Sequence, residues 1–181
     1  MSQALSFKQG DEKWHAYRKR FLSDLYWANN VVLGFGGFFP LQEKTHLLLH
    51  RFLERKTGIT EIDNAPIQKI EAPRGSGKSL CSTIGHAVQL ACADPNIAIL
   101  IANEKELTAI GFLAAIKHQF EQNEFLRALF PEVIPPDFKD VEWSATRASL
   151  ARSTGRPEPT FDTIGVGGTV TGKHYDVILC D

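Results

Sequence analysis

A glycine-rich segment that ends in Gly-Lys-Ser is the part of the sequence whose residue types and spacing point most directly to chemistry. It covers residues 72–79, Ala-Pro-Arg-Gly-Ser-Gly-Lys-Ser. Gly75 and Gly77 allow the backbone to turn its N–H groups toward one anion, and the positive end of a following helix adds to the attraction. Lys78 is then placed to reach the β- and γ-phosphates of a nucleotide, and the Ser79 hydroxyl to complete a Mg²⁺ shell. The sequence therefore predicts a phosphate-binding loop.

The loop departs at one position from the G-x-x-x-x-G-K-[ST] pattern, because Ala72 stands where the first glycine is expected. Alanine is small, so the departure weakens the match without breaking it. The alternative reading is a Gly/Ser turn that precedes a helix by chance. Residues 67–71 predict a short strand, and residues 80–93 are apolar and free of proline. Strand, loop and helix are therefore expected in the order that the motif requires.

The composition limits how many hydrophobic cores the chain can form and how it could bind nucleic acid. The 181 residues are 43% hydrophobic, which is enough for one sizeable core and gives no reason for two separate cores. The formal net charge of −1 supplies no global basic field of the kind typical of nucleic-acid-binding proteins. Any contact with DNA must therefore come from particular residues.

Cysteine usage and the N-terminus indicate the compartment. Cys81, Cys92 and Cys180 include no C-x-x-C pair, which fits reduced thiols that pack inside a cytosolic protein. Residues 1–13 are polar, and no apolar run is long enough to span a membrane. The sequence predicts a soluble, intracellular protein.

The spacing of apolar residues predicts the elements that would position the loop. Helices are expected over residues 11–33, 42–57, 80–93, 104–122 and 124–130. Strands are expected over residues 67–71, 97–102, 160–166 and 175–180. The uninterrupted apolar run 97–102 is typical of a parallel strand covered on both faces. Residues 59–66 are expected to form a loop, and residues 135–159 a polar excursion from the sheet. The expected class is α/β, a mostly parallel sheet flanked by helices.

An apolar strand that ends in a carboxylate is the second chemical feature. Residues 175–181 read Tyr-Asp-Val-Ile-Leu-Cys-Asp. In P-loop ATPases such a strand lies beside the loop, and its terminal aspartate holds Mg²⁺ through water because a hard cation prefers oxygen ligands. We therefore expect Asp181 to join Ser79 at a Mg²⁺ site.

Three segments together resemble the N-terminal ATPase domain of bacteriophage large terminase subunits, the motors that package DNA into procapsids. These segments are residues 72–79, 123–132 and 165–176, and the resemblance extends from Phe39 to Asp181. An arginine inside the loop, here Arg74, is a habit of this family. The resemblance implies a P-loop NTPase fold of the ASCE, RecA-like type and an ATPase that uses ATP and Mg²⁺. It implies three catalytic residues, Arg74, Lys78 and Asp181. Of these, Arg74 would sense the γ-phosphate.

The resemblance also implies a nucleotide-binding set. This set comprises Ala72, Pro73, Arg74, Gly75, Ser76, Gly77, Lys78 and Ser79, with Gln42 on the adenine side next to residues 39–40. A helix whose first turn holds Gln42 explains that last segment equally well. Residues 1–65 would form an N-terminal helical lid on the adenine side, and residues 66–181 the ATPase core.

The partners implied by the resemblance are double-stranded DNA, the portal protein and the small terminase subunit. The family assembles as a homo-oligomeric ring in the cytoplasm of the bacterial host, as a phage or prophage product without a membrane segment. ATP hydrolysis in this superfamily needs an acidic residue directly after the magnesium-binding aspartate. The family sheet also inserts a later strand between the loop strand and the aspartate strand. We therefore expect the 181 residues to be part of a longer polypeptide that carries the rest of the ATPase and a nuclease, or a remnant, inactive alone.

Basic residues and histidines outside the loop have alternative readings. Three arginines of the polar excursion either touch DNA phosphates or belong to an exposed charged loop; they are Arg147, Arg152 and Arg156. Lys173 either reaches the nucleotide of a neighbouring subunit or is a turn lysine facing solvent. His46 and His50 share a helix face as zinc ligands can, but the sequence places no third ligand near them, which favours ordinary helix histidines.

Two other functional classes remain open. A helicase-like nucleic-acid-dependent ATPase shares the loop and the aspartate strand, and would continue into a second RecA-like domain. A truncated prophage product or nucleotide-binding assembly module without turnover would end at Asp181.

Overall fold

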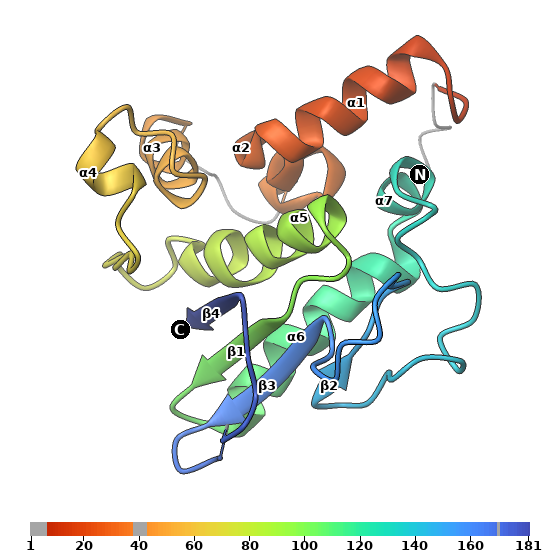
Figure 1. Ribbon diagram of the computed structural model, residues 1–181. Helices are drawn as coiled ribbons and strands as arrows, with labels where there is room; N and C mark the ends of the chain where they lie inside the picture. Colours follow the sequence, from red (N-terminus) through yellow and green to blue (C-terminus); the bar gives the residue numbers. More distant parts are fainter. Residues whose placement is uncertain (1–6, 38–42, 170) are drawn as a thin grey trace.

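A mixed β-sheet flanked by helices forms the centre of the computed structural model, which describes residues 7–37, 43–169 and 171–181 (Figure 1). The sheet has strand order β2-β3-β1-β4. Its strands are β1 (Ile99–Asn103), β2 (Arg147–Ala148), β3 (Phe161–Gly165) and β4 (Val177–Cys180). β1 pairs in parallel with both β3 and β4, and the short β2 pairs antiparallel with β3. The predicted α/β class with a mostly parallel sheet is therefore confirmed for the described residues.

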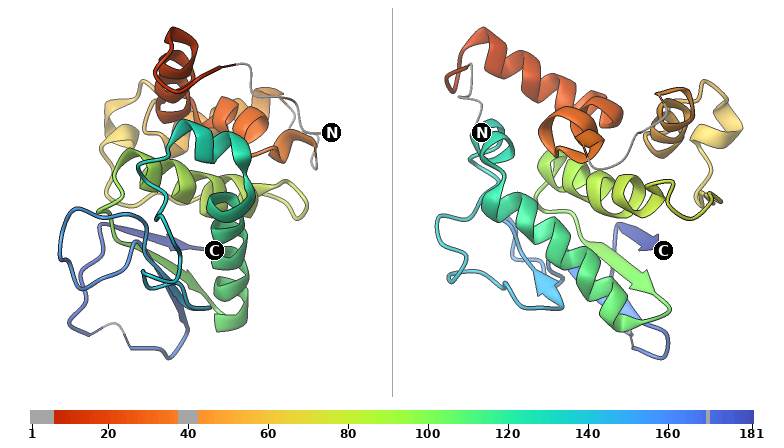
Figure 2. Two further views of the ribbon diagram at one scale, coloured as in Figure 1. Left: turned by 90° about the vertical axis from the view of Figure 1, so that its right-hand side faces the viewer. Right: turned by 180° about the vertical axis from the view of Figure 1, so that it is seen from behind.

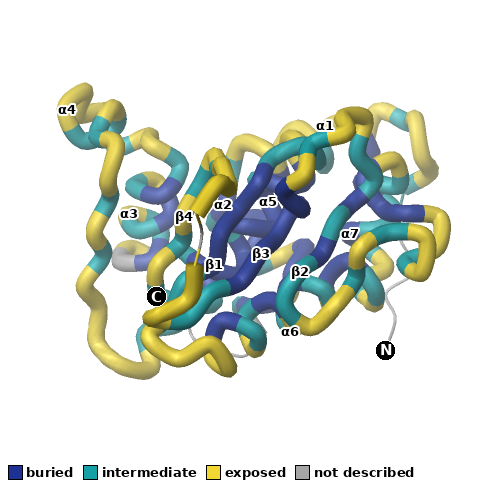
Figure 3. Tube along the Cα trace, turned by 60° about the horizontal axis from the view of Figure 1, so that its bottom comes forward, coloured by how far each residue is buried: buried dark blue, intermediate teal, exposed yellow. Residues whose placement is uncertain are grey.

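β1 is the middle strand of the parallel set, with Ile101 level with Thr163 of β3 and with Leu179 of β4. The first three residues of β1 are all buried, as expected for a parallel strand covered on both faces. Figure 3 shows β1 and β3 as buried traces near the centre, whereas β4 at the sheet edge alternates between half-buried and exposed residues. The strands predicted over residues 97–102, 160–166 and 175–180 correspond to β1, β3 and β4.

The strand predicted over residues 67–71 is wrong. These residues pair with no strand among the described ones, and Ile67 is 84% exposed. A strand needs a neighbour that offers hydrogen-bonding groups, and β4, the edge strand, pairs only with β1 within the described chain. The segment contacts α3 (Glu43–Leu53) instead of the sheet, because the Gln68 side chain donates a hydrogen bond of 2.6 Å to the carbonyl of Phe52.

The helix predicted over residues 80–93 is present as two consecutive parts, which we call the loop helix. They are the π-helical η3 (Leu80–Gly85) and α5 (His86–Ala93). The other helices are α1 (Glu12–Ser23), α2 (Leu25–Trp27), η1 (Ala28–Val32), η2 (Phe35–Gly37), α3 (Glu43–Leu53), α4 (Thr60–Asp63), α6 (Glu106–Gln122) and α7 (Glu124–Leu129).

Three local predictions differ from the structure in detail. The helix expected over residues 42–57 ends at Leu53. The single helix expected over residues 11–33 is divided at Asp24, whose carboxylate accepts a 2.9 Å hydrogen bond from the Trp27 N–H and so begins a new helix. The loop expected over residues 59–66 contains the short helix α4.

One hydrophobic core joins the N-terminal helices to the sheet. The helix α6 packs along β1 and β3, and the loop helix contacts both α6 and β4. α1, α2 and α3 lie above the loop helix and the sheet lies below it (Figure 1, Figure 2). Phe21 of α1, Ile84 of η3 and Phe161 of β3 belong to the same buried cluster. The loop helix is therefore fixed from both sides. The predicted division into a helical lid, residues 1–65, and an ATPase core, residues 66–181, stays a prediction.

Candidate functional site

The loop at residues 72–79 has the backbone conformation that its glycines predict. Gly75 and Gly77 have φ angles of 77° and 75°, in the left-handed region that glycine adopts without steric cost. The Ser76 N–H donates to the Pro73 carbonyl at 3.3 Å and closes the turn. Within the described part of the chain, the N–H groups of Gly75 and Gly77 have no hydrogen-bond acceptor. These groups, at the start of the loop helix, form an arrangement that suits an anion.

The loop meets the end of β4 at Asp181. Lys78 Nζ lies 2.7 Å from Asp181 Oδ1, although the two residues are 103 positions apart in sequence. The Thr83 hydroxyl donates to Asp181 Oδ2 at 2.8 Å, and the Ser79 side chain is also hydrogen-bonded to this carboxylate. The Asn103 side-chain amide donates to the Asp181 backbone carbonyl. The structure thus brings the predicted Lys78, Ser79 and Asp181 together, and we call them, with residues 72–77 and Thr83, the loop site.

The electrostatics of the loop site keep Asp181 ionised. Burial alone would raise the pKa of Asp181, but hydrogen bonds from Lys78, Ser79 and Thr83 outweigh it, so the pKa lies below its ordinary value. An ionised carboxylate beside a serine hydroxyl is a set of hard oxygen donors. The residues present therefore fit a Mg²⁺ ion.

The remaining predicted residues differ in how far the structure describes them. Arg74 is exposed and forms no hydrogen bond or ion pair with any described residue, so its guanidinium is available to an anion bound at the loop. Ala72 and Pro73 are also exposed at the entry to the loop. Gln42 and residues 39–40 lie outside the described residues, and the adenine-side assignment stays a prediction.

Two residues of the site were missed in the sequence, although signals for both exist. Thr83 follows Ser79 by one helical turn, so the two hydroxyls share a face. Asn103 ends β1, and the register that pairs Ala102 with Cys180 places Asn103 level with Asp181. The carboxyl ends of adjacent parallel strands meet at one edge of the sheet, where ligands of α/β proteins bind.

A second group of charged residues surrounds Asp162 of β3, which is 3% exposed. Lys173 Nζ lies 2.9 Å from Asp162 Oδ2, and the Tyr175 hydroxyl donates to the same oxygen at 2.7 Å. Arg147 pairs with Glu142 at 2.8 Å and approaches Asp162 at 3.7 Å. Lys173 is thus held by its own chain.

The other two arginines of the excursion extend this group. Arg156 pairs with Glu158 at 3.1 Å and with Asp176 at 2.5 Å. Arg152 donates to the carbonyl of Asn96 at 2.8 Å and to that of Glu158. We call these residues, with those around Asp162, the Asp162 region. The three arginines are half-buried and bind acceptors of their own chain, and contact with DNA phosphates stays a prediction.

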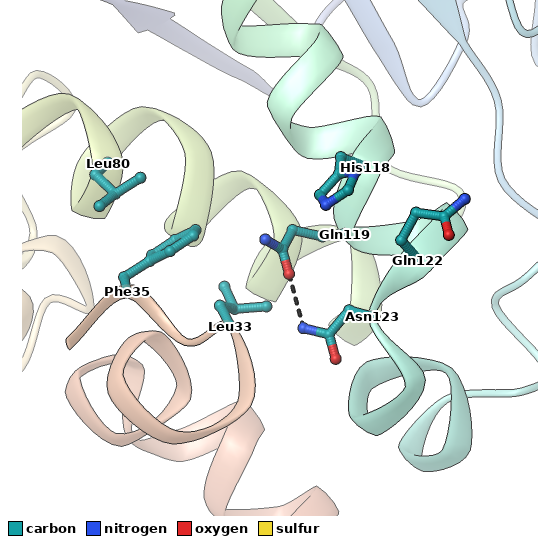
Figure 4. A pocket seen from close by; sticks show the side chains of 7 residues that line it. All are labelled: Leu33, Phe35, Leu80, His118, Gln119, Gln122 and Asn123. Carbon is teal, nitrogen blue, oxygen red and sulfur yellow. Dashed lines mark hydrogen bonds between the residues drawn. The ribbon is translucent and has the colours of Figure 1, made fainter. Parts of the chain in front are cut away.

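A pocket of about 550 Å³ lies beside the loop helix (Figure 4). It is lined by Leu33, Phe35, Leu80, His118, Gln119, Gln122 and Asn123. The Asn123 amide donates to Gln119 Oε1 at 2.7 Å across its wall. Leu80 directly follows the loop, but no residue from 72 to 79 lines this pocket. The loop site and the pocket are therefore separate features.

Comparison of the chain with models of protein families, with curated proteins and with solved structures gave no match. None of the helices in the described ranges has the length and apolar character needed to cross a membrane. The geometry of the loop site therefore has to carry the functional argument.

Proposed function

We propose that this chain binds Mg·ATP between residues 72–79 and Asp181, as the ATPase domain of a bacteriophage large terminase subunit. One observation carries the nucleotide site: the 2.7 Å contact between Lys78 and Asp181 joins a glycine-rich loop to the carboxyl end of a parallel strand. The three segments that resemble terminases support the more specific part of the proposal. Hydrolysis of ATP would then drive double-stranded DNA into a procapsid.

Each residue of the loop site has a role that follows from its chemistry. The N–H groups of Gly75 and Gly77 bind phosphate oxygens. Lys78 exchanges Asp181 for the β- and γ-phosphates, because both are anionic acceptors within reach of its flexible side chain. Ser79 and Asp181 hold Mg²⁺, and the hydrogen bond from Thr83 orients the carboxylate.

The exposed Arg74 completes the site from the loop side. A guanidinium next to the γ-phosphate forms two parallel hydrogen bonds and stabilises the negative charge that develops during phosphoryl transfer. Ser79 and Asp181 would hold a Mg²⁺ ion, which would supply positive charge to offset that of the phosphates. The chain's own residues thus provide phosphate binding, metal binding and charge stabilisation at one edge of the sheet.

The motor context comes from the resemblance alone. In that context the partners are double-stranded DNA, the portal protein and the small terminase subunit, and the assembly is a ring in the cytoplasm of the bacterial host.

Nucleotide binding is tested by titrating the chain with a fluorescent ATP analogue in the presence of Mg²⁺. Lys78→Ala removes a charge-assisted hydrogen bond worth about 1.5–3 kcal/mol, so affinity should fall about tenfold to a hundredfold. Lys173→Ala is the matched control, because Lys173 also contacts an aspartate but lies outside the loop site. Equal losses in the two variants, or none in Lys78→Ala, would contradict the proposal.

The motor function is tested on the complete polypeptide by measuring ATP turnover with and without DNA. Stimulation by double-stranded DNA that disappears in Lys78→Ala is the expected result. Stimulation by single-stranded DNA together with strand separation would instead indicate a helicase-like ATPase. Binding without turnover in every condition would indicate a nucleotide-binding module.

A further inference from the structure

A buried group of nitrogen and sulfur side chains lies where α3 packs on the loop helix. His46 and His50 of α3 and Cys81 of η3 place one ligand atom each within 4.8 Å of one another. Their exposed fractions are 7%, 1% and 0%. In sequence the two histidines have no third ligand nearby, but the fold brings Cys81 to them from 35 residues beyond His46. The interpretation of His46 and His50 as ordinary helix histidines is therefore incomplete.

The His50 imidazole presents its lone pair to this group, and the His46 ring lies beside Cys81. His50 Nδ1 lies against the His46 backbone carbonyl, which can only accept, so the proton is on Nδ1 and the lone pair is on Nε2. His46 Nδ1 lies 3.8 Å from Cys81 Sγ, and the same ring is hydrogen-bonded to the backbone of Ser76. Metal-binding histidines characteristically donate their second ring N–H to a backbone carbonyl or carboxylate. His50 has this arrangement.

Asn29 of η1 supplies an independent observation. It is fully buried, and its Oδ1 has no hydrogen-bond partner among the residues that the structure describes, while its Nδ2 lies 2.8 Å from His50 Nε2. A buried amide oxygen without a partner costs about 1–3 kcal/mol. Rotating the amide by half a turn would bring Oδ1 to the side of His50 Nε2, where a cation would satisfy both atoms.

Gly85 explains how Asn29 enters this space. A Cβ atom at Gly85 would lie 1.9 Å from Asn29 Oδ1, so any other residue would push the amide away. Gly85 ends the π-helical part of the loop helix, which begins next to Cys81. π-Helical turns inside α-helices are frequent at functional sites. The candidate ligands thus lie next to three unusual features, which are the π-helical turn η3, Gly85 and the unpaired amide oxygen of Asn29.

We propose that His46, His50, Cys81 and Asn29 form a zinc site that fastens α3 to the loop helix. Two imidazoles and a thiolate favour Zn²⁺ over Mg²⁺, because the softer sulfur and nitrogen donors match the softer ion. Zinc–ligand distances of about 2.0–2.3 Å place tetrahedral ligand atoms about 3.5 Å apart. The ligand atoms of the two histidines and Cys81, which lie within 4.8 Å of one another, therefore have to approach by about 1 Å at most. On binding, Zn²⁺ replaces the Cys81 thiol proton, which passes to solvent.

The position of the site gives it a structural role beside the phosphate loop. Cys81 follows Ser79 by two residues, and the His46 ring is hydrogen-bonded to Ser76 within the loop. A metal that joins these residues would hold the loop against α3 whether or not nucleotide is bound. The zinc site does not depend on the proposed ATPase function, and each can fail without the other.

The site is tested with Co²⁺, which replaces Zn²⁺ and reports its ligands by absorption. The chain is treated with a chelator and titrated with Co²⁺; we expect a near-ultraviolet charge-transfer band from the thiolate and visible bands of tetrahedral cobalt. Cys81→Ser should remove the charge-transfer band. Cys92→Ser is the matched control, because Cys92 is a buried cysteine of the same helix outside the site, and it should retain the band.

Three further readouts keep the test decisive. Zn²⁺ should raise the midpoint of thermal unfolding of the wild type but not of Cys81→Ser. His50→Gln should weaken Co²⁺ binding by more than about tenfold. Asn29→Asp should tighten it, because a carboxylate is a better ligand than an amide. A folded wild-type chain without the charge-transfer band, or a band that survives in Cys81→Ser, would overturn the proposal.

Discussion

Asp162 and Asp181 are aspartates of the same sheet, and each contacts one lysine. Lys173 Nζ lies 2.9 Å from Asp162, and Lys78 Nζ lies 2.7 Å from Asp181. Asp162 lies near the amino end of β3, whereas Asp181 directly follows the carboxyl end of β4. In parallel sheets ligands bind at the carboxyl ends. The two lysine–aspartate contacts are similar as ion pairs, but only the one at Asp181 lies at the end of the sheet where ligands bind.

The surroundings differ as well. The partners of Asp162 include a tyrosine and an arginine, and the region closes on itself through Arg156 and Glu158. The partners of Asp181 are a lysine and hydroxyls, residue types that can also bind phosphate and metal, next to two glycine N–H groups without acceptors among the described residues. The Asp162 region is held together by contacts within its own chain, although the buried Nε atoms of Arg147 and Arg152 have no hydrogen-bond partner among the described residues. The loop site, in contrast, has partners that a ligand could replace. An ion pair indicates a ligand site only when its residues are of types that can bind a ligand in place of each other.

The largest effect that separates the two regions should be on stability. Asp162→Ala leaves Lys173, Arg147 and Tyr175 without their acceptor, and breaking such a buried group destabilises by about 3 kcal/mol. Asp181→Ala should lower the free energy of unfolding by only about 1 kcal/mol, because Lys78 can reach solvent. Urea unfolding followed by circular dichroism measures both. Equal losses would mean that the Asp181 contact is also structural.

A smaller loss is expected at Arg152, which ties the excursion to the chain before β1. Arg152→Met leaves the carbonyls of Asn96 and Glu158 without their donor and should lower the free energy of unfolding by about 2 kcal/mol. Arg51→Met on α3 is the control, since Arg51 is exposed and its side chain makes no hydrogen bond within the described ranges. If both variants unfold like the wild type, the excursion is not held by this arginine.

Two glycines with similar backbone conformations, one inside the loop site and one outside it, separate phosphate binding from stability. Gly75 and Gly167 have φ angles of 77° and 91°, and a Cβ atom at either would meet nothing within 4 Å. Alanine at either position should therefore cost a similar amount of stability, about 1 kcal/mol, through backbone strain. Only Gly75→Ala should also weaken binding of Mg·ATP, as measured by nucleotide titration. Weakened binding in Gly167→Ala would show that strain alone accounts for the effect.

The smallest expected effect is a pH dependence within the Asp162 region. A backbone hydrogen bond from His174 and the neighbouring Arg156 lower the pKa of Glu158 from 4.5 to about 2. The stability that Glu158 contributes is therefore complete above pH 4.5 and is lost as the pH falls toward 2. Glu158→Gln should melt a few degrees below the wild type at neutral pH, and the difference should shrink in that acidic window.

The matched control for this pH effect is Glu61→Gln on α4. Glu61 is exposed, and its side chain forms no hydrogen bond with the described residues. Its melting curve should follow the wild type at every pH. A difference between wild type and Glu158→Gln that stays constant with pH would contradict the assigned ion pairs.

Local patterns predicted much of this molecule. The positive φ angles of Gly75 and Gly77, the helix after the loop and β1, β3 and β4 follow from residue types at fixed spacings. The approach of Asp181 to Lys78 was predictable too, because the carboxyl end of a parallel strand is where such a loop binds ligands.

Features that depend on distant partners were not predictable in the same way. Residues 67–71 have strand-like composition, but a strand requires a neighbour that the local sequence does not specify. The arginines of the excursion find acceptors in β3, at Asp176 just before β4 and in the turn before β1, which no spacing reveals. Cys81 joins His46 and His50 only because η3 packs on α3.

The most direct test of the contrast between the two aspartates is a titration of the ¹⁵N-labelled chain with Mg·ATP, followed by two-dimensional NMR. The amide signals of Gly75, Gly77 and Asp181 should shift together, while those of Asp162 and Lys173 stay in place. Unchanged loop signals at saturating nucleotide, or equal shifts around Asp162, would contradict the assignment of the loop site.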